Sequence, residues 1–239
     1  MKITTHGDNL IQLTRLGFVN CYLVRENDGF TLIDTGISGS TQSILAAASS
    51  YHLPIVRIVL THAHVDHVGS LDELHQALPD AEVAITARDA RFLTGDHSLD
   101  ANEPQVKLRG GYPICKTRPT RELSHGDRIG SLEVIATPGH TPGHVAFLDT
   151  RDRALIAGDA FQTLGGVAVS GTFKPLFPLP ALATWHKPTA LDSARKLYAL
   201  APTRLAVGHG RVLVDPLEEM ERAIATLARE VEGQSRHAA

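Results

Sequence analysis

Residues 61–67 read T-H-A-H-V-D-H and directly follow an apolar, β-branched run that predicts a buried strand. In an extended segment, residues i and i+2 point to the same side, so His62 and His64 can hold one metal ion together. The chain then turns toward a helix, and Asp66 and His67 can point to a second position nearby. Imidazole nitrogens and carboxylate oxygens suit Zn²⁺, and also Fe and Mn. The stretch therefore predicts a metal site at the end of a strand.

Three later residues also follow predicted strands, and each comes directly after a glycine that lets the backbone approach closely. These residues are His140, Asp159 and His209, after strands predicted over 132–136, 154–157 and 205–207. Together with the first cluster they supply seven ligands, which is enough for two metals. Asp159 is the natural bridge, because a carboxylate can give one oxygen to each ion.

Short strands dominate both halves of the chain, with helices between and after them. The other predicted strands are 11–16, 20–24, 30–33, 56–60, 81–86 and 145–148. Helices are predicted over 40–51, from a capping box at Ser70 and Glu73, and after Asp215 and Pro216 near the end. Residues 94–120 and 161–188 are expected to be long connections. The pattern predicts an α+β protein of two packed sheets with helices outside, as a single domain over 1–239 with a frayed, disordered tail from about Gly233.

Composition limits the function classes. The chain has 239 residues, 13 histidines and a net charge of −3, so no broad basic field exists to bind a nucleic acid backbone. No apolar run approaches the ~20 residues that span a bilayer, and the N-terminus has no apolar signal region. Cys21 and Cys115 form no disulfide or metal pattern. We therefore expect a cytoplasmic protein that acts on a small molecule, without nucleic acid or membrane partners.

The pattern H-x-H-x-D-H at 62–67, with a later His, Asp and His, resembles the metallo-β-lactamase superfamily, in the branch similar to glyoxalase II and acyl-homoserine lactonases. The resemblance extends from I-D-T-G at 33–36 to G-H-G at 208–210. It implies a four-layer αβ/βα sandwich of two mixed sheets with helices on the outer faces. It also assigns the ligands: His62, His64 and His140 to the first metal; Asp66, His67 and His209 to the second; Asp159 between them.

The resemblance implies a dinuclear hydrolase with two Zn²⁺, or Mn²⁺ or Fe²⁺, that cleaves an ester, lactone or thioester by attack of a metal-bridging hydroxide. Asp66 is expected to bind its metal and also to orient or pass a proton. The alternative is an oxidoreductase similar to persulfide dioxygenases, which share the motif but use one iron. Asp159 and the absence of a cysteine ligand disfavour penicillin hydrolysis, and Phe161 stands near the position of a lactonase tyrosine.

The remaining candidates surround the predicted ligands. Asp34 is expected to stand behind the first cluster, and His144 to act as a further supporting donor. The segment 161–188 is anchored beside the metals at both ends, so we expect it to wall the substrate pocket. The candidate wall residues are Phe161, Phe173, Phe177, Trp185 and His186. The alternative for these side chains is core packing or a homodimer contact.

Overall fold

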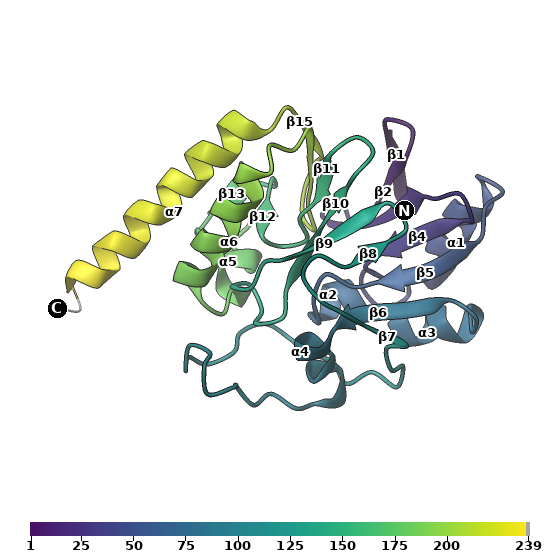
Figure 1. Cartoon of the computed structure of the whole chain (residues 1–239), viewed down its shortest axis with the longest axis horizontal. Helices are drawn as coiled ribbons and strands as arrows, with labels where there is room; N and C mark the ends of the chain where they lie inside the picture. The colour runs from purple at the N-terminus through teal and green to yellow at the C-terminus, as the bar shows by residue number, and fades with distance from the viewer. Residues whose placement is uncertain (238–239) are drawn as a thin grey trace.

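In the part of the chain that the structure describes, two mixed β-sheets lie face to face (Figure 1). The computed structural model describes residues 1–237, and for 234–237 the backbone alone. The first sheet has seven described strands in chain order: β1 (Lys2–His6), β2 (Leu10–Arg15), β3 (Val19–Arg25), β4 (Phe30–Ile33), β5 (Ile55–Val59), β6 (Glu82–Thr86) and β7 (Arg121–Leu123). Its first four strands are antiparallel, whereas β4 to β7 run parallel to one another.

The second sheet has the strand order β15-β14-β11-β10-β9-β8. Its strands are β8 (Arg128–Ile129), β9 (Leu132–Ala136), β10 (Val145–Asp149), β11 (Ala154–Ile156), β14 (Arg204–Ala206) and β15 (Leu213–Val214). The pair of β11 and β14 is parallel, and the other pairs are antiparallel. A separate hairpin pairs β12 (Phe161–Gln162) with β13 (Ala168–Val169).

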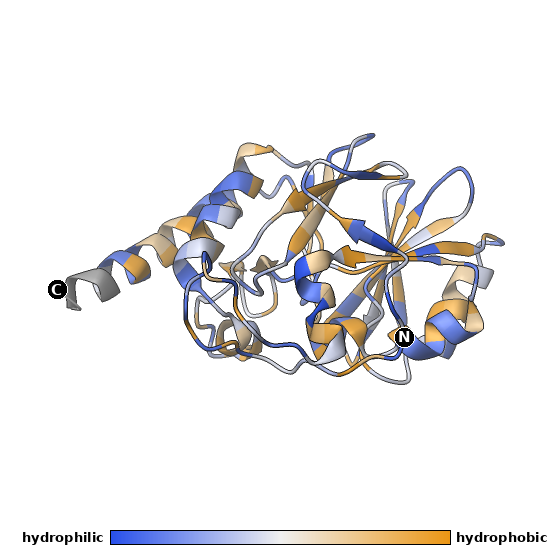
Figure 2. Ribbon diagram, turned by 60° about the horizontal axis from the view of Figure 1, so that its bottom comes forward, coloured by the Kyte–Doolittle hydropathy of each residue, from blue (hydrophilic) through white to orange (hydrophobic). Residues whose placement is uncertain are grey.

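Helices cover the outer faces of both sheets, with polar residues turned outward (Figure 2). The helices are α1 (Thr41–Ser49), α2 (Val65–Val68), α3 (Leu71–Ala77), α4 (Ala87–Ala90), a 3-10 turn (Phe92–Thr94), α5 (Leu179–Ala183), α6 (Lys187–Ala199) and α7 (Leu217–His237). Helices α1 and α3 pack on the first sheet, and α6 and α7 pack on the second. This arrangement confirms the predicted α+β sandwich of two mixed sheets.

Alternation along the strands separates the apolar side chains into layers. In β3, Leu23 faces α1 and α3, whereas Tyr22 and Val24 face the other sheet. In β10, Leu148 faces the second pair of helices, and Phe147 points into the core between the sheets. Both β3 and β10 are therefore buried on both sides, which explains why their sequences are nearly continuous apolar runs.

Several local expectations were wrong. The segment 161–188 contains β12, β13 and α5, and it leads directly into α6, which the sequence analysis did not predict. Ser70 makes no capping bond: its hydroxyl donates to the carbonyl of Ile37, and Glu73 accepts from Thr41. Helix α7 extends from Leu217 to His237, so the tail expected from about Gly233 begins within this helix; residues 238 and 239 lie outside the described residues, and the disorder of the tail stays a prediction.

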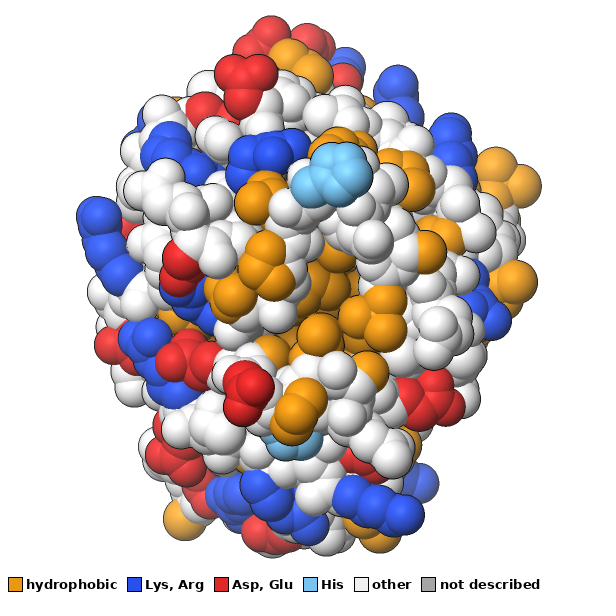
Figure 3. Space-filling model, turned by 90° about the vertical axis from the view of Figure 1, so that its right-hand side faces the viewer, with side chains coloured by type: hydrophobic (Ala, Val, Ile, Leu, Met, Phe, Trp, Pro, Cys, Tyr) orange, Lys and Arg blue, Asp and Glu red, His pale blue; other side chains and the backbone are white. Residues whose placement is uncertain are grey.

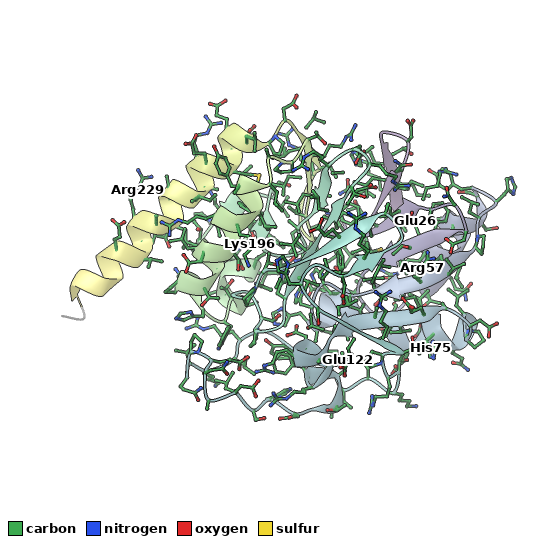
Figure 4. The ribbon with its side chains drawn as sticks, viewed as in Figure 1. Glu26, Arg57, His75, Glu122, Lys196 and Arg229 are labelled. Carbon is green, nitrogen blue, oxygen red and sulfur yellow. The ribbon has the colours of Figure 1, made fainter. Side chains whose placement is uncertain are left out.

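Helix α6 is held against the second sheet near both of its ends. Lys196 on α6 points toward β9 and donates to the carbonyl of Ala136 at 3.0 Å (Figure 4). At the start of the helix, the backbone N–H groups of Trp185 and His186 donate to the carbonyls of His140 and Gly139. The chain that follows β9 and the chain that precedes α6 are therefore held side by side.

The outer face of α1 and α3 carries an apolar hollow (Figure 3). A cavity of about 340 Å³ in this region is lined by Leu45, Ala48, Leu53 and Leu78, among others. It lies away from the histidine cluster, because none of its lining residues is a predicted ligand. Among the described helices, none is long and apolar enough to cross a membrane.

Candidate metal centre

The seven predicted ligands come together at one edge of the two sheets, in the loops that follow strands and in the short helix α2. Three overlapping groups have all their ligand atoms within 4.8 Å of one another: His62, His64 and His140; His62, His67 and Asp159; and Asp66, His67 and His209. The backbone of His64 is extended, with φ −73° and ψ 152°, and α2 begins at the next residue. This change of conformation sends His62 and His64 to one side and then turns Asp66 and His67 toward the other group.

The first group consists of three histidines. Nε2 of His62 lies 3.1 Å from Nδ1 of His64, and the same Nδ1 lies 3.0 Å from Nε2 of His140. All three rings are nearly inaccessible to solvent. Three imidazole nitrogens at mutual contact distance form one face of a metal coordination sphere.

The second group contains carboxylates. Nε2 of His209 lies 3.2 Å from an oxygen of Asp66 and 3.2 Å from Oδ2 of Asp159. Asp159 reaches both groups: its Oδ1 lies 3.3 Å from Nε2 of His67, and its Oδ2 lies 3.4 Å from Nε2 of His140. The carboxylate of Asp159 thus stands between the two clusters.

The outer nitrogens of these rings are held by other groups, which determines which nitrogen faces the centre. His64 donates from Nε2 to the carbonyl of Arg109, and His209 donates from Nδ1 to the carbonyl of Phe18, each at 3.0 Å. His67 donates from Nδ1 to Asp34 at 2.8 Å. A neutral imidazole that donates on one side presents a lone pair on the other. The inward Nδ1 of His64 is therefore an acceptor, whereas nearby carboxylates raise the pKa values of His67 and His209, so their inward nitrogens present lone pairs only once a proton is displaced.

Thr61 sets the orientation of His62 in the same way. Its hydroxyl donates to Asp34, so it accepts from Nδ1 of His62 and leaves Nε2 free to face inward. Nδ1 of His140 lies 2.8 Å from the hydroxyl of Ser170, behind the ring. Lone pairs of neutral histidines that face one another at about 3 Å repel unless a cation lies between them.

The donor set fits a pair of metal ions. Within the described residues, Nε2 of His67 and Oδ1 of Asp159 are buried and lack a hydrogen-bond partner. Orphaned buried polar atoms are costly and call for an explanation, and a metal ion supplies one. A Cβ at Gly208 would lie 2.1 Å from Asp159 Oδ1, so glycine is needed where the backbone passes the centre.

The two groups differ in their electrostatics. Burial lowers the pKa of His64 to about 4 and holds the pKa values of His62 and His140 well below the ordinary range. Burial also opposes protonation of His209, but the carboxylates of Asp159 and Asp66 outweigh it and raise the pKa of His209 to about 10. The first group is therefore neutral at pH 7, whereas His209 carries a proton when no metal replaces it.

Asp34 and His144 lie directly behind the ligands. Asp34 has a left-handed backbone, with φ 60°, and accepts from His67 and from both the N–H and the hydroxyl of Thr61. His144 accepts the backbone N–H of Asp159 through Nε2 at 3.1 Å and contacts Thr137 through Nδ1. Burial lowers the pKa of His144 to about 3, so it remains a neutral acceptor that positions the bridging residue.

A pocket of about 450 Å³ opens onto the predicted ligands His64, Asp66, His140, Asp159 and His209. Its apolar lining comes from Phe18, Val19, Ile37, Val65, Leu179, Pro180, Leu182 and Ala183. The segment 161–188 thus contributes to the wall through α5, but through different residues from those expected.

The expected wall residues are placed elsewhere. Phe161 is fully buried in the core of the second sheet, and Phe173 is 58% exposed outside the pocket. Phe177 packs behind the pocket, with its ring 5.1 Å from that of His209 and 5.5 Å from that of Phe18. Trp185 and His186 line a neighbouring groove. Phe161, Phe177 and Trp185 are buried, whereas Phe173 is exposed, so the lack of a hydrophobic period in this segment did not indicate a pocket wall.

Asp89 is a further supporting residue, and it was not among the residues predicted from the sequence. Its fully buried carboxylate accepts from the N–H of Ala63, the hydroxyl of Thr141 and the N–H of Gly143. It therefore ties the loop between His62 and His64 to the loop that carries His140. Its position could have indicated this role, because Asp89 comes shortly after the end of β6, just as the predicted ligands come shortly after the ends of their strands.

Comparisons with known proteins agree with this geometry. The model of the metallo-beta-lactamase superfamily matches residues 14–209. An uncharacterized protein of Bacillus subtilis, YobT, is 53% identical over 86% of this chain and 89% of its own length. A hydroxyacylglutathione hydrolase of Rhodospirillum rubrum is 31% identical over 94% of this chain and 74% of its own length. The solved structure of TTHA1623 in a di-iron-bound form is 31% identical, covers 87% of this chain and 94% of that one, and has a TM-score of 0.65. The chain therefore belongs to the metallo-β-lactamase superfamily.

Proposed function

We propose that the protein is a dinuclear metal-dependent hydrolase that cleaves an ester, lactone or thioester bond of a small molecule. The observation that carries the proposal is the pair of ligand groups with the Asp159 carboxylate between them. His62, His64 and His140 would hold one ion, and Asp66, His67 and His209 the other. A single-iron oxygenase would leave the second group, Asp66, His67 and His209, without a role.

Divalent ions bound in these groups lower the pKa of water and polarise a carbonyl, which is the chemistry that such a hydrolysis needs. Zn²⁺ is our first choice, and Mn²⁺ and Fe²⁺ suit the same ligands. The hydroxyacylglutathione hydrolase relative supports hydrolysis of a thioester or a related carbonyl compound.

Asp66 is the ligand that we assign to proton handling. Its side chain is 30% exposed and lines the pocket, whereas Asp159 is buried. One of its oxygens contacts His209 at 3.2 Å. A carboxylate that contacts both the metal ligands and the pocket can hold a proton during transfer to a leaving group.

A substrate panel tests the proposal. We expect purified protein loaded with Zn²⁺ to hydrolyse aryl esters, lactones or thioesters, to lose this activity with a chelator and to recover it when the metal is restored. A bis-aryl phosphodiester should not be hydrolysed. Measurement of kcat/KM across the panel would overturn the proposal if only the phosphodiester were cleaved, or if chelation left ester hydrolysis unchanged.

A further inference from the structure

A second cavity, of about 590 Å³, adjoins the metal pocket. We call it the cationic groove, and it is lined by residues 106–110 on one side and by Leu182, Trp185 and His186 on the other. Gly110 and Leu182 line both cavities. The indole N–H of Trp185 donates to the carbonyl of Val106 at 3.1 Å, which holds the two walls together. A molecule that occupies the metal pocket can therefore extend into this groove.

The groove has two cations that are not neutralised. Lys107 and Arg109 are exposed, and among the described residues neither has an ion-pair partner. The nearby acidic residues are already engaged: Glu103 pairs with Arg88 at 2.6 Å, and Asp100 pairs with Arg91 at 2.7 Å. No described Asp or Glu lines the groove. Its field is therefore positive, next to an apolar pocket.

The loop that carries these cations is fixed relative to the metal centre. The carbonyl of Arg109 accepts from Nε2 of His64 at 3.0 Å. A Cβ at Gly110 would lie 2.3 Å from the same nitrogen, and its φ of 86° also favours glycine. Because the backbone contacts a predicted ligand at this point, the loop that carries Lys107 and Arg109 is held beside the centre.

We propose that Lys107 and Arg109 bind an anionic group of the substrate, a carboxylate or a phosphate, while its carbonyl lies at the metal centre. This inference rests on the proposed hydrolase function and narrows its substrates to compounds with an apolar portion and a negative charge beyond it. The guanidinium of Arg109 can pair with either anion through two N–H groups, and Lys107 adds a second charge.

The test uses matched thioesters. One set contains phenyl thioesters of adipic acid, of its neutral monoamide and of 5-phosphonopentanoic acid, which share a four-methylene spacer and separate a carboxylate from a phosphate-like group. A second pair contains hexanoyl thioesters of mercaptopropionic acid and mercaptopropionamide, which place the charge on the leaving group. We expect kcat/KM for one of the charged compounds to exceed that of its neutral partner by about tenfold, the effect of an exposed charge-assisted hydrogen bond.

In the double variant Lys107→Gln with Arg109→Gln, kcat/KM for the preferred charged compound should fall by about tenfold more than kcat/KM for its neutral partner, so that the preference is lost. Lys116→Gln is the matched control, because it removes an exposed charge from the same loop between α4 and β7. It should leave the ratio of kcat/KM between charged and neutral compounds unchanged. The preference of the wild-type protein should also weaken at high salt. Equal rates for charged and neutral members of both sets, or an equal loss for all compounds in the double variant, would overturn the inference.

A binding measurement separates this inference from the proposed function. The anilides that correspond to the phenyl thioesters are titrated calorimetrically into the holoprotein, because an amide serves as a poorly reactive analogue. Charge-selective binding without hydrolysis of any thioester would support the groove and contradict the hydrolase. Hydrolysis without charge-selective rates or binding would support the hydrolase and contradict the groove.

Discussion

The two ligand groups of the metal centre are built from different chemistry. The first consists of three buried histidines without a carboxylate of its own, and burial keeps their pKa values low. The second combines His67 and His209 with Asp66, and its carboxylates raise the pKa of His209 to about 10. The first group is thus ready to accept a cation at neutral pH, whereas the second must exchange a proton for one.

The supports behind the two groups differ as well. The first is fixed by hydroxyls and backbone groups: Thr61, Ser170 and the carbonyl of Arg109. In the second, His67 donates to a carboxylate, Asp34, which makes its inward nitrogen more basic. In the proposed dinuclear centre, neutral rings held by hydroxyls and carbonyls would form the first site, carboxylates and the histidines paired with them would form the second, and Asp159 would couple the two.

Removal of that coupling should have the largest effect. In Asp159→Ala, we expect metal content to fall at both groups and kcat/KM to fall by more than about 100-fold, beyond what loss of a supporting residue costs. Metal analysis and kinetics on the same preparation check this, with the exposed Asp192→Asn as the control. Full metal content in Asp159→Ala would show that the carboxylate does not join the two groups.

Single-ligand variants should separate the groups. His140→Ala should weaken the first site, and His209→Ala the second, so that each protein retains about one ion per chain. Cobalt substitution gives a spectroscopic readout: a histidine-only site and a carboxylate-containing site should have different visible spectra. If both variants kept the same spectrum, the two groups would not be distinct sites.

Asp89→Asn should affect the first group more than the second. The carboxylate of Asp89 accepts from Ala63 and Thr141, which flank ligands of the first group. An amide cannot accept all three of its bonds, so we expect about a 10- to 100-fold loss of affinity for the first ion. Competition with a chelating dye measures this, and the exposed Asp80→Asn serves as the control. Equal weakening of both ions would contradict the assignment.

The number of protons released on metal binding should differ between the two groups, and this is the smallest of the expected effects. The pKa of His209 in the metal-free protein is raised to about 10, so it is protonated at pH 8 and must lose that proton to bind a cation. Affinity for the second ion should therefore rise as pH increases toward 10. Calorimetric titration in two buffers of different ionisation enthalpy should show about one proton fewer released in His209→Asn at pH 8. His64, whose pKa is about 4, should release none at that pH.

Much of the fold and the ligand set could be predicted from the sequence because both depend on local patterns. The strands at 30–33 and 132–136 have the predicted bounds, since their apolar runs are buried on both faces. His140, Asp159 and His209 were found by their position after strands, and the sandwich topology brings these strand ends to one edge.

The pocket wall could not be predicted, because it depends on contacts between segments that are distant in sequence. Phe18 follows β2, and Leu182 belongs to α5, yet both line one cavity. The Arg109 carbonyl accepts a hydrogen bond from His64, and such a backbone contact has no signature in the amino-acid sequence. Phe161 was expected to line the pocket but lies in the core of the second sheet. The sequence does not distinguish these positions, because an aromatic residue near a predicted ligand has the same local pattern in either case.

Metal titration of the protein tests the central claim most directly. Full-length protein freed of metal with a chelator is titrated with Zn²⁺, while bound metal and hydrolysis of a responsive ester are measured together. Two ions per chain are predicted, with full activity reached only after the second binds. Full activity at one ion per chain, with no binding of a second, would contradict the dinuclear centre.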